Sequence, residues 1–287
     1  MAEFDEFPLG FDETHEEEQA GQLGDMLLAE LPCSAPSDIP KDMPVDWFTQ
    51  QSQGSWPFCH SHMRTACAEF LYWLATKGKV VQYSRAFGAI TNLRMDGNDS
   101  RPAGASISGS MRAANKYGEA LEDLFPYFKN GIYTNQIPAS VSDNASKHRI
   151  EKVVPSCRSY DQMDAALTTG LFALALGFTW TTGWDAVRGQ QFLDGIPGGR
   201  VRGGHALAGF GWLTRAGERW YCLHNSHDGW GTNMRCYLSP KTWDNLLRNS
   251  PYGANLVSDI KITDETVSRD WEWLAGMNFD AGGVQIA

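Results

Sequence analysis

The sequence of 287 residues contains no apolar run long enough to cross a membrane. It has no basic start followed by an apolar stretch, so we expect no signal peptide. Its six cysteines include no Cys-x-x-Cys pair and form no dense framework. With 42% hydrophobic and 20% charged residues, the composition is that of an ordinary globular protein. These features favour a reducing, cytoplasmic location.

Positive charge is missing from residues 1–31, which contain ten Asp and Glu and no Lys or Arg. The whole chain has 34 acidic and 24 basic residues, so 34 − 10 = 24 acids remain to balance 24 bases. Because this remainder is neutral, charge gives no reason to expect nucleic acid as a partner.

We interpret residues 1–46 as an acidic leader that is extended and solvated when alone. The leader also carries apolar residues near its start: Phe4, Phe7, Leu9 and Phe11. Two interpretations have about equal weight. Either the leader is disordered, or these residues dock onto a basic, apolar-lined surface of a larger assembly, for which a viral particle is one candidate.

Helical patterns concentrate in the first half of the chain and strand patterns in the second. Apolar periodicity and capping residues predict helices over residues 59–76, 111–117 and 161–169, and a short helix from Ser239-Pro240. Strand-like runs lie at 171–180, 205–213, 219–224, 234–238 and 255–262. This segregation, without any internal repeat, predicts an α+β protein with two lobes.

Three residues stand in an order that indicates cysteine catalysis. Cys59 lies where an irregular stretch gives way to a predicted helix, and His205 opens an apolar strand 205 − 59 = 146 residues later. Asn225 ends the next apolar run. A thiol becomes a strong nucleophile as a thiolate, which a helix N-terminus favours. His205 is then the base and proton donor, and Asn225 orients its ring.

A fourth residue fits the same chemistry. Gln53 precedes Cys59 by six positions. Its side-chain amide, together with the backbone N–H of Cys59, is placed to donate hydrogen bonds to the oxyanion of an acyl-transfer reaction.

The segments that carry these residues resemble the papain-like cysteine peptidases. VDWFTQQSQGSWPFC, ending at Cys59, is similar to the start of the mature enzymes, and HALAGFG and HNSHDGWG are similar to their His and Asn strands. The layout is closest to bacterial and phage-encoded members without a long propeptide. Since family zymogens use a far longer helical propeptide, we predict that residues 1–46 do not act as a removable inhibitor.

The resemblance implies a papain-like two-lobed fold with the active-site cleft between the lobes. It divides residues 47–287 into a mainly helical lobe (47–150), a mainly antiparallel β lobe (151–263) and a C-terminal extension (264–287). GASISGSMRAANKYG, from Gly104, is similar to the family's substrate-binding turn and following helix. The substrate-binding residues implied are Gly104, Ala105, Ile107 and Ala206, and we expect their pocket to prefer an apolar side chain.

Two departures from the family concern the site itself. His60 follows Cys59 and His227 follows Asn225 by two positions, where the family has Trp. A His in place of the second Trp is expected to shield the Asn–His hydrogen bond less well from water. The histidines near Cys59 also make a zinc site conceivable, but adjacent helix positions point about a quarter-turn apart. We therefore expect no metal and no cofactor.

Three other patterns have plainer interpretations. A cysteine such as Cys59, considered alone, is typical of a buried structural thiol. The presence of Gln53, His205 and Asn225 in the expected order favours catalysis. The glycine-rich residues 195–204 do not lie between a strand and a helix, so we interpret them as a flexible approach to His205 rather than a phosphate loop. His15 and His148 are interpreted as solvated loop residues.

The sequence predicts a cysteine endopeptidase that acts on a protein or peptide substrate through an acyl-enzyme. One alternative is a weak or inactive structural subunit with the same fold. A second is an acyltransferase or deamidase that uses the same Cys–His pair.

Overall fold

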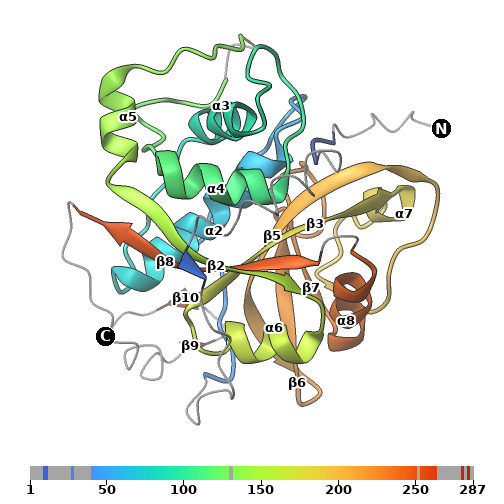
Figure 1. Ribbon diagram of the computed structural model, residues 1–287. Coiled ribbons are helices and arrows are strands. Elements are labelled where there is room, and N and C mark those ends of the chain that lie inside the picture. Colours follow the sequence, from blue (N-terminus) through green and yellow to red (C-terminus); the bar gives the residue numbers. More distant parts are fainter. Residues whose placement is uncertain are drawn as a thin grey trace.

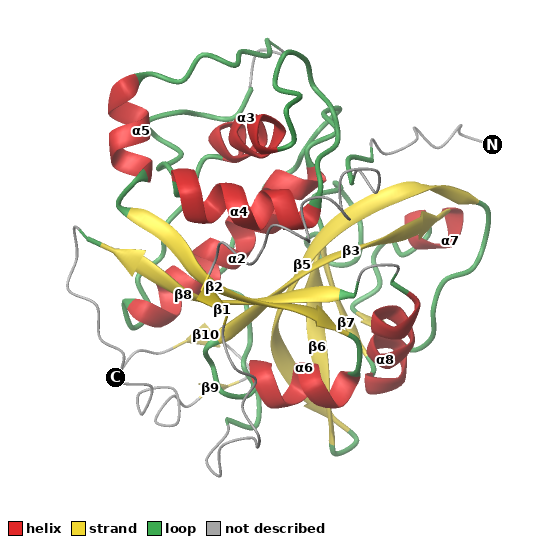
Figure 2. Ribbon diagram, in the orientation of Figure 1, coloured by secondary structure: helices red, strands yellow, loops and turns green. Residues whose placement is uncertain are grey.

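The computed structural model describes residues 9–11, 27–28, 40–128, 132–250, 253–263, 279–280 and 283–284. Helices from the first half of the chain gather above a mostly antiparallel sheet formed by the second half (Figures 1 and 2). This arrangement confirms the α+β class. In the described part of the chain, no helix combines the length and apolar character that a membrane span requires.

The central helix α2 (Cys59–Ala75) is buried along its whole length. It contacts α3 (Arg85–Met95) and α4 (Ile107–Tyr117) on one side and strands of the sheet on the other. The prediction of a helix over 59–76 is confirmed, and α4 begins four residues before the predicted start at 111. The short helix α5 (Ala139–Ala145) completes this group.

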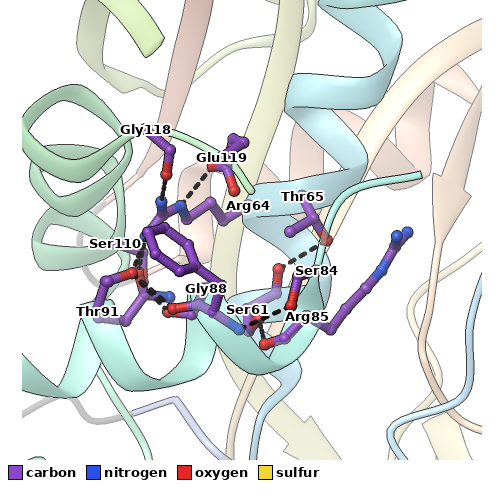
Figure 3. A network of polar contacts seen from close by, with 12 residues as sticks. Ser61, Arg64, Thr65, Ser84, Arg85, Gly88, Thr91, Ser110, Gly118 and Glu119 are labelled. Atoms are coloured by element: carbon purple, nitrogen blue, oxygen red, sulfur yellow. Dashed lines mark hydrogen bonds and ion pairs between the residues drawn. The ribbon is translucent and has the colours of Figure 1, made fainter. Parts of the chain in front are cut away.

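A buried polar network fixes α2 against its helical neighbours. The side chain of Arg64 donates to the Glu119 carboxylate at 2.6 Å, to Thr91 Oγ1 at 2.9 Å and to the Gly118 carbonyl at 2.5 Å (Figure 3). Burial raises the pKa of Glu119, and the Arg64 charge opposes this shift. Because a buried charge is tolerated when paired and hydrogen-bonded, the network holds the helix that carries Cys59 in one position.

Seven strands from the second half of the chain and the short strand β1 from the leader form an eight-stranded sheet in the order β1-β2-β8-β3-β5-β6-β7-β4. Its central pairings are antiparallel, and only the short edge strands β1 and β4 pair in parallel. The strands are β1 (Leu27–Leu28), β2 (His148–Cys157), β3 (Phe172–Thr181), β4 (Phe192–Leu193), β5 (Val201–Arg215), β6 (Glu218–His224), β7 (Arg235–Leu238) and β8 (Ala254–Ile262).

All five predicted strands are present, with ends that agree or differ by up to four residues. The strand β2 was not predicted, and the interpretation of His148 as a solvated loop residue is wrong. His148 is 3% exposed and its ring lies against Tyr72 and Tyr83. The pairing of β2 with β8 buries it.

Helices also cover the outer side of the sheet. They are α6 (Tyr160–Leu167), α7 (Thr182–Asp185) and α8 (Pro240–Asn249). The Ser239 hydroxyl caps α8 by accepting from the Thr242 N–H, as the Ser-Pro start predicted. In the predicted C-terminal extension, β9 (Phe279–Asp280) pairs with β10 (Gly283–Val284).

Candidate active site

Cys59 is the first residue of α2 and is completely buried. No side chain caps this end of the helix, so its first N–H groups and the helix dipole favour an anion there. Burial nevertheless raises the pKa of the Cys59 thiol to about 12, while backbone hydrogen bonds at Ala206, Gly10 and His60 oppose the rise. Burial therefore disfavours the thiolate, whereas the helix N-terminus favours it.

His205, on β5, and Asn225, the residue that follows β6, form the predicted pair. His205 Nε2 lies 2.8 Å from Asn225 Oδ1, and both side chains are buried. The same oxygen accepts from the Ser226 N–H at 2.7 Å, which identifies it as the acceptor. The imidazole proton is therefore on Nε2.

The other ring nitrogen, Nδ1, is available for the thiol. His205 Nδ1 is buried and has no hydrogen-bond partner among the described residues. Cys59 is adjacent, because its thiol bonds to the backbone of Ala206, the residue after His205. Burial lowers the pKa of His205 to about 4, the Asn225 bond opposes this shift, and the Arg202 charge adds to it.

Two aromatic rings lie against His205 and cover its hydrogen bond to Asn225. His227 stacks on His205, with ring centroids 4.2 Å apart and planes at 23°. Trp180, near the end of β3, meets His205 edge to face at 4.5 Å. Sequence spacing identified His227 but missed Trp180. The available signal was strand pairing, which places Trp180 opposite Gly203, two residues before His205.

Gln53 is held next to the Asn225 loop. Its Nε2 donates to the Trp56 carbonyl at 2.7 Å, and its Oε1 accepts from Ser226 Oγ at 2.5 Å. The backbone N–H of Gln53 also donates to the Ser226 carbonyl at 2.9 Å. Ser226, the residue after Asn225, therefore orients the Gln53 side-chain amide, which the sequence analysis assigned to the oxyanion. These contacts hold Gln53 and the Asn225 loop together.

The four predicted substrate-binding residues lie around residues 9–11 of the leader. The Ala105 N–H donates to the Gly10 carbonyl at 2.9 Å. A Cβ on Gly104 would lie 2.8 Å from the same oxygen. Ile107 begins α4 and lies beside Gly177 on the other wall, and Ala206 lies at Cys59.

Residues 9–11 lie across the start of α2 and form the short dark blue segment in Figure 1. Phe11 donates its N–H to the Gly204 carbonyl at 3.3 Å and is only 7% exposed. The sequence did not indicate whether the leader covers the candidate site, and the structure places these three residues beside Cys59. That residues 1–46 do not act as a removable inhibitor stays a prediction. Phe4 and Phe7 lie outside the described residues, so their docking to a partner stays a prediction.

The histidines outside the pair have structural partners. His62 Nδ1 lies 3.0 Å from the Phe58 carbonyl, and His224 Nε2 lies 3.1 Å from the Phe210 carbonyl. Within the described ranges, no group of three or more His, Cys, Asp or Glu is placed to hold a metal. Cys222 and Cys236, on paired strands β6 and β7, are both free thiols.

Comparison with solved structures identifies the architecture. Xylellain, a cysteine protease from Xylella fastidiosa, matches with a TM-score of 0.67 and 16% identity, over 90% of this chain and 98% of that one. Procathepsin B S9 from Trypanosoma congolense matches with a TM-score of 0.59 and 13% identity, over 92% and 85%. The chain has the papain-like fold. At these identities the similarity concerns the fold alone.

Sequence comparisons add less. No protein-family model matches the sequence. Phosphoribosyl isomerase A of Mycobacterium leprae is 25% identical over 138 residues, which cover 42% of this chain and 57% of that protein. The chain thus spans little more than half the length of this relative.

Proposed function

We propose that the protein is a cysteine endopeptidase that hydrolyses peptide bonds through a thioester acyl-enzyme. The main support is the buried His205–Asn225 pair beside the first residue of α2, with the Nδ1 atom of His205 unpaired. A thiol, a base and a residue that orients the base are the three parts that nucleophilic catalysis requires.

The chemistry follows from these positions. His205 Nδ1 takes the proton of Cys59, and the thiolate adds to the substrate carbonyl carbon. The resulting oxyanion accepts hydrogen bonds from the Gln53 amide and the Cys59 N–H. His205 returns the proton to the leaving amine as the C–N bond breaks. Water then adds to the thioester with His205 as base, and the carboxylate product leaves as the thiol is restored.

The decisive variant is Cys59→Ala, assayed by peptide hydrolysis in the full chain and in a form lacking residues 1–11. We expect hydrolysis to fall by at least about 10⁴-fold, with His205→Ala nearly as severe and Asn225→Ala milder. Cys67→Ala is the matched control, since Cys67 is a buried thiol on the same helix with its Sγ against the Leu174 carbonyl. Hydrolysis that survives in the Cys59 variant refutes the assignment, whereas the Cys67 variant should keep its activity.

The alternative functions give different results. A structural subunit shows no Cys59-dependent labelling by an epoxide or iodoacetamide probe once residues 1–11 are removed. An acyltransferase gives amide products when an amine acceptor is added. Attachment of the acidic leader to a larger assembly, with a viral particle as one candidate, rests on the charge of residues 1–31 and on the apolar residues Phe4, Phe7, Leu9 and Phe11.

A further inference from the structure

Trp180 is a buried ring that lies against two imidazoles of the site. Its centroid is 4.5 Å from that of His205 and 5.6 Å from that of His227, and it meets both rings edge to face. The indole is completely buried. Because a buried indole N–H needs an acceptor, the group that accepts from Trp180 determines how the indole is held against His205.

The acceptor is Asp185, at the end of the short helix α7. Trp180 Nε1 donates to Asp185 Oδ1 at 2.7 Å. Both oxygens of the same carboxylate accept from Arg202 Nη1 at 2.8 Å. The Arg202 and Asp185 side chains are 7% and 18% exposed, so water screens this ion pair only in part. One carboxylate therefore holds both a neutral ring and a cation.

The cation acts on the candidate base. Arg202 precedes His205 by three residues on β5, and its charge is one of the causes that lower the pKa of His205. In the described part of the chain, the titratable or charged side chains that face this ring are Cys59, His227 and Arg202. A cation disfavours a protonated imidazole, and a carboxylate paired with the cation opposes that effect. Asp185 therefore limits how strongly Arg202 acts on His205.

Backbone contacts fix α7 where Asp185 reaches both partners (Figure 1). A Cβ on Gly183 would lie 2.0 Å from the Gly198 carbonyl oxygen, so α7 and the glycine-rich residues 195–204 approach closely here. The Thr182 N–H donates to the Arg200 carbonyl at 3.0 Å, and Thr182 Oγ1 accepts from the Arg200 N–H at 3.1 Å. The glycine-rich segment is therefore bonded to α7, and it leads from there into β5.

We propose that Asp185 is a positioning residue for His205. It holds the Trp180 indole that shields the imidazole, and it balances the charge of Arg202. That this positioning assists hydrolysis rests on the proposed function. The hold on the imidazole stands on the contacts alone, so it is tested on the ring itself.

The first measurement follows the Nε2 proton of His205 by NMR in the full-length chain with isotope-labelled histidine, and the His205→Gln protein assigns the signal. In Asp185→Ala this proton should exchange with water at least about tenfold faster, because the indole loses its acceptor. Asp185→Asn should exchange at nearly the unchanged rate, since its amide oxygen still accepts from the indole. An unchanged exchange rate in Asp185→Ala overturns the hold on the ring.

The second measurement is the pKa of His205, read from the same ring as the pH is varied. Asp185→Asn should lower this pKa, because Arg202 loses its counter-charge, and Arg202→Met should raise it, because the cation is gone. The double variant should return toward the unchanged value. A merely structural role does not produce opposite shifts. Shifts of the same sign in both single variants, or no shift in either, overturn the charge balance.

Peptide hydrolysis by the same proteins separates this inference from the proposed function. In an active enzyme, the alkaline limit of kcat/KM reports loss of the imidazolium proton. It should move toward acid in Asp185→Asn and toward alkali in Arg202→Met. If the exchange rate and the pKa of His205 change as expected in a chain that hydrolyses no peptide, the positioning is supported and the peptidase is refuted.

Two matched controls separate positioning from lost stability. Asp164 on α6 has the same 18% exposure and likewise holds an arginine and an aromatic side chain, so Asp164→Asn should leave the His205 signals unchanged. Gly183→Ala should displace α7 and act like Asp185→Ala, whereas Gly198→Ala, whose added Cβ has no neighbour within 4 Å, should have no effect. Thermal unfolding checks that each variant is folded. His205 signals that change as much in Asp164→Asn as in the Asp185 variants would overturn the proposal.

Discussion

At the scale of single residues, the space that holds the Phe11 ring exists because two of its neighbours are glycines, which have no side chain. Gly177 on β3 and Gly204 on β5 leave the room that the aromatic ring fills. Ile107 supplies an apolar wall. The expectation of an apolar pocket was drawn from Ile107 and Ala206, and the two glycines indicate that its size suits an aromatic side chain.

We predict that Gly177→Val reverses this preference. The new side chain would begin 2.8 Å from Ile107 Cγ1 and so fill the pocket, while a β-branched residue suits a strand. The Gly10→Ala variant is used as background, because its added Cβ would lie 2.0 Å from the Pro57 carbonyl oxygen and so displace residues 9–11. In this background, kcat/KM for substrates whose Phe side chain enters the space beside Gly177 should fall roughly 10- to 100-fold relative to substrates with Ala there. A peptide library measures the ratio, with Gly198→Ala as control. An unchanged ratio would show that the ring of a substrate binds elsewhere.

The candidate residues Cys59, His205 and Asn225 could be singled out from sequence because such a combination is rare and its order is informative. Trp180 could not, since its contact with His205 depends on the register between β3 and β5. The role of Gly10 could not either. A single glycine in an acidic segment carries no pattern, and its importance appears only against the Pro57 carbonyl.

At the scale of elements, continuous apolar runs were predicted well and mixed sequences were not. The strands β3, β5 and β8 each contain a run of mainly apolar residues and were expected. The strand β2 mixes charged and apolar residues, so only Ile150 and Val153 among its central positions signal burial. Helix α3 was missed because it contains Gly88. That glycine is needed where α3 approaches α2, since a Cβ there would lie 2.7 Å from Ser61 Oγ.

The packing of α2 predicts a large effect of one substitution. Arg64→Met leaves the Glu119 carboxylate buried without its partner, which should lower the free energy of unfolding by about 3–5 kcal/mol. The double variant with Glu119→Gln should recover much of the loss, because no buried charge remains. Urea unfolding measures both. Arg248→Met, which breaks an exposed pair with Asp244, is the control and should have little effect. Equal stabilities for the single and double variants would contradict this account.

At the scale of the whole molecule, the site is assembled from segments distant in sequence. The start of α2, the turn before α4, the β5 strand and the Asn225 loop meet at Cys59, and residues 9–11 close over them. The two-lobed class and the catalytic order follow from sequence. The closing of one part of the chain over another does not, because a three-residue extended contact has no periodicity of its own.

Closure by the leader should depend on pH. Burial lowers the pKa of His205 from 6.5 to about 4, and Leu9 and Phe11 contribute to this burial by covering Gly203 and Gly204 beside it. A depressed imidazole pKa stabilises the closed form above 6.5, and this stabilisation is lost as pH falls through about 4. The raised pKa of the Cys59 thiol makes closure depend on pH in the alkaline range as well. Its contribution is complete below the thiol's ordinary 9.0 and is lost as pH rises through about 12.

We therefore predict that closure is strongest near neutral pH and weakens in acid. The labelling rate of the unchanged chain, divided by that of Gly10→Ala at the same pH, cancels the intrinsic reactivity of the thiol. This ratio should be lowest near neutral pH and should rise toward one as the pH approaches 4, the lowered pKa of His205. The ratio of Gly198→Ala to the unchanged chain should stay at one throughout. If the ratio of the unchanged chain to Gly10→Ala does not change with acidity, the leader contributes nothing to the burial of His205. Release of residues 9–11 would then require a partner or a cut in the chain.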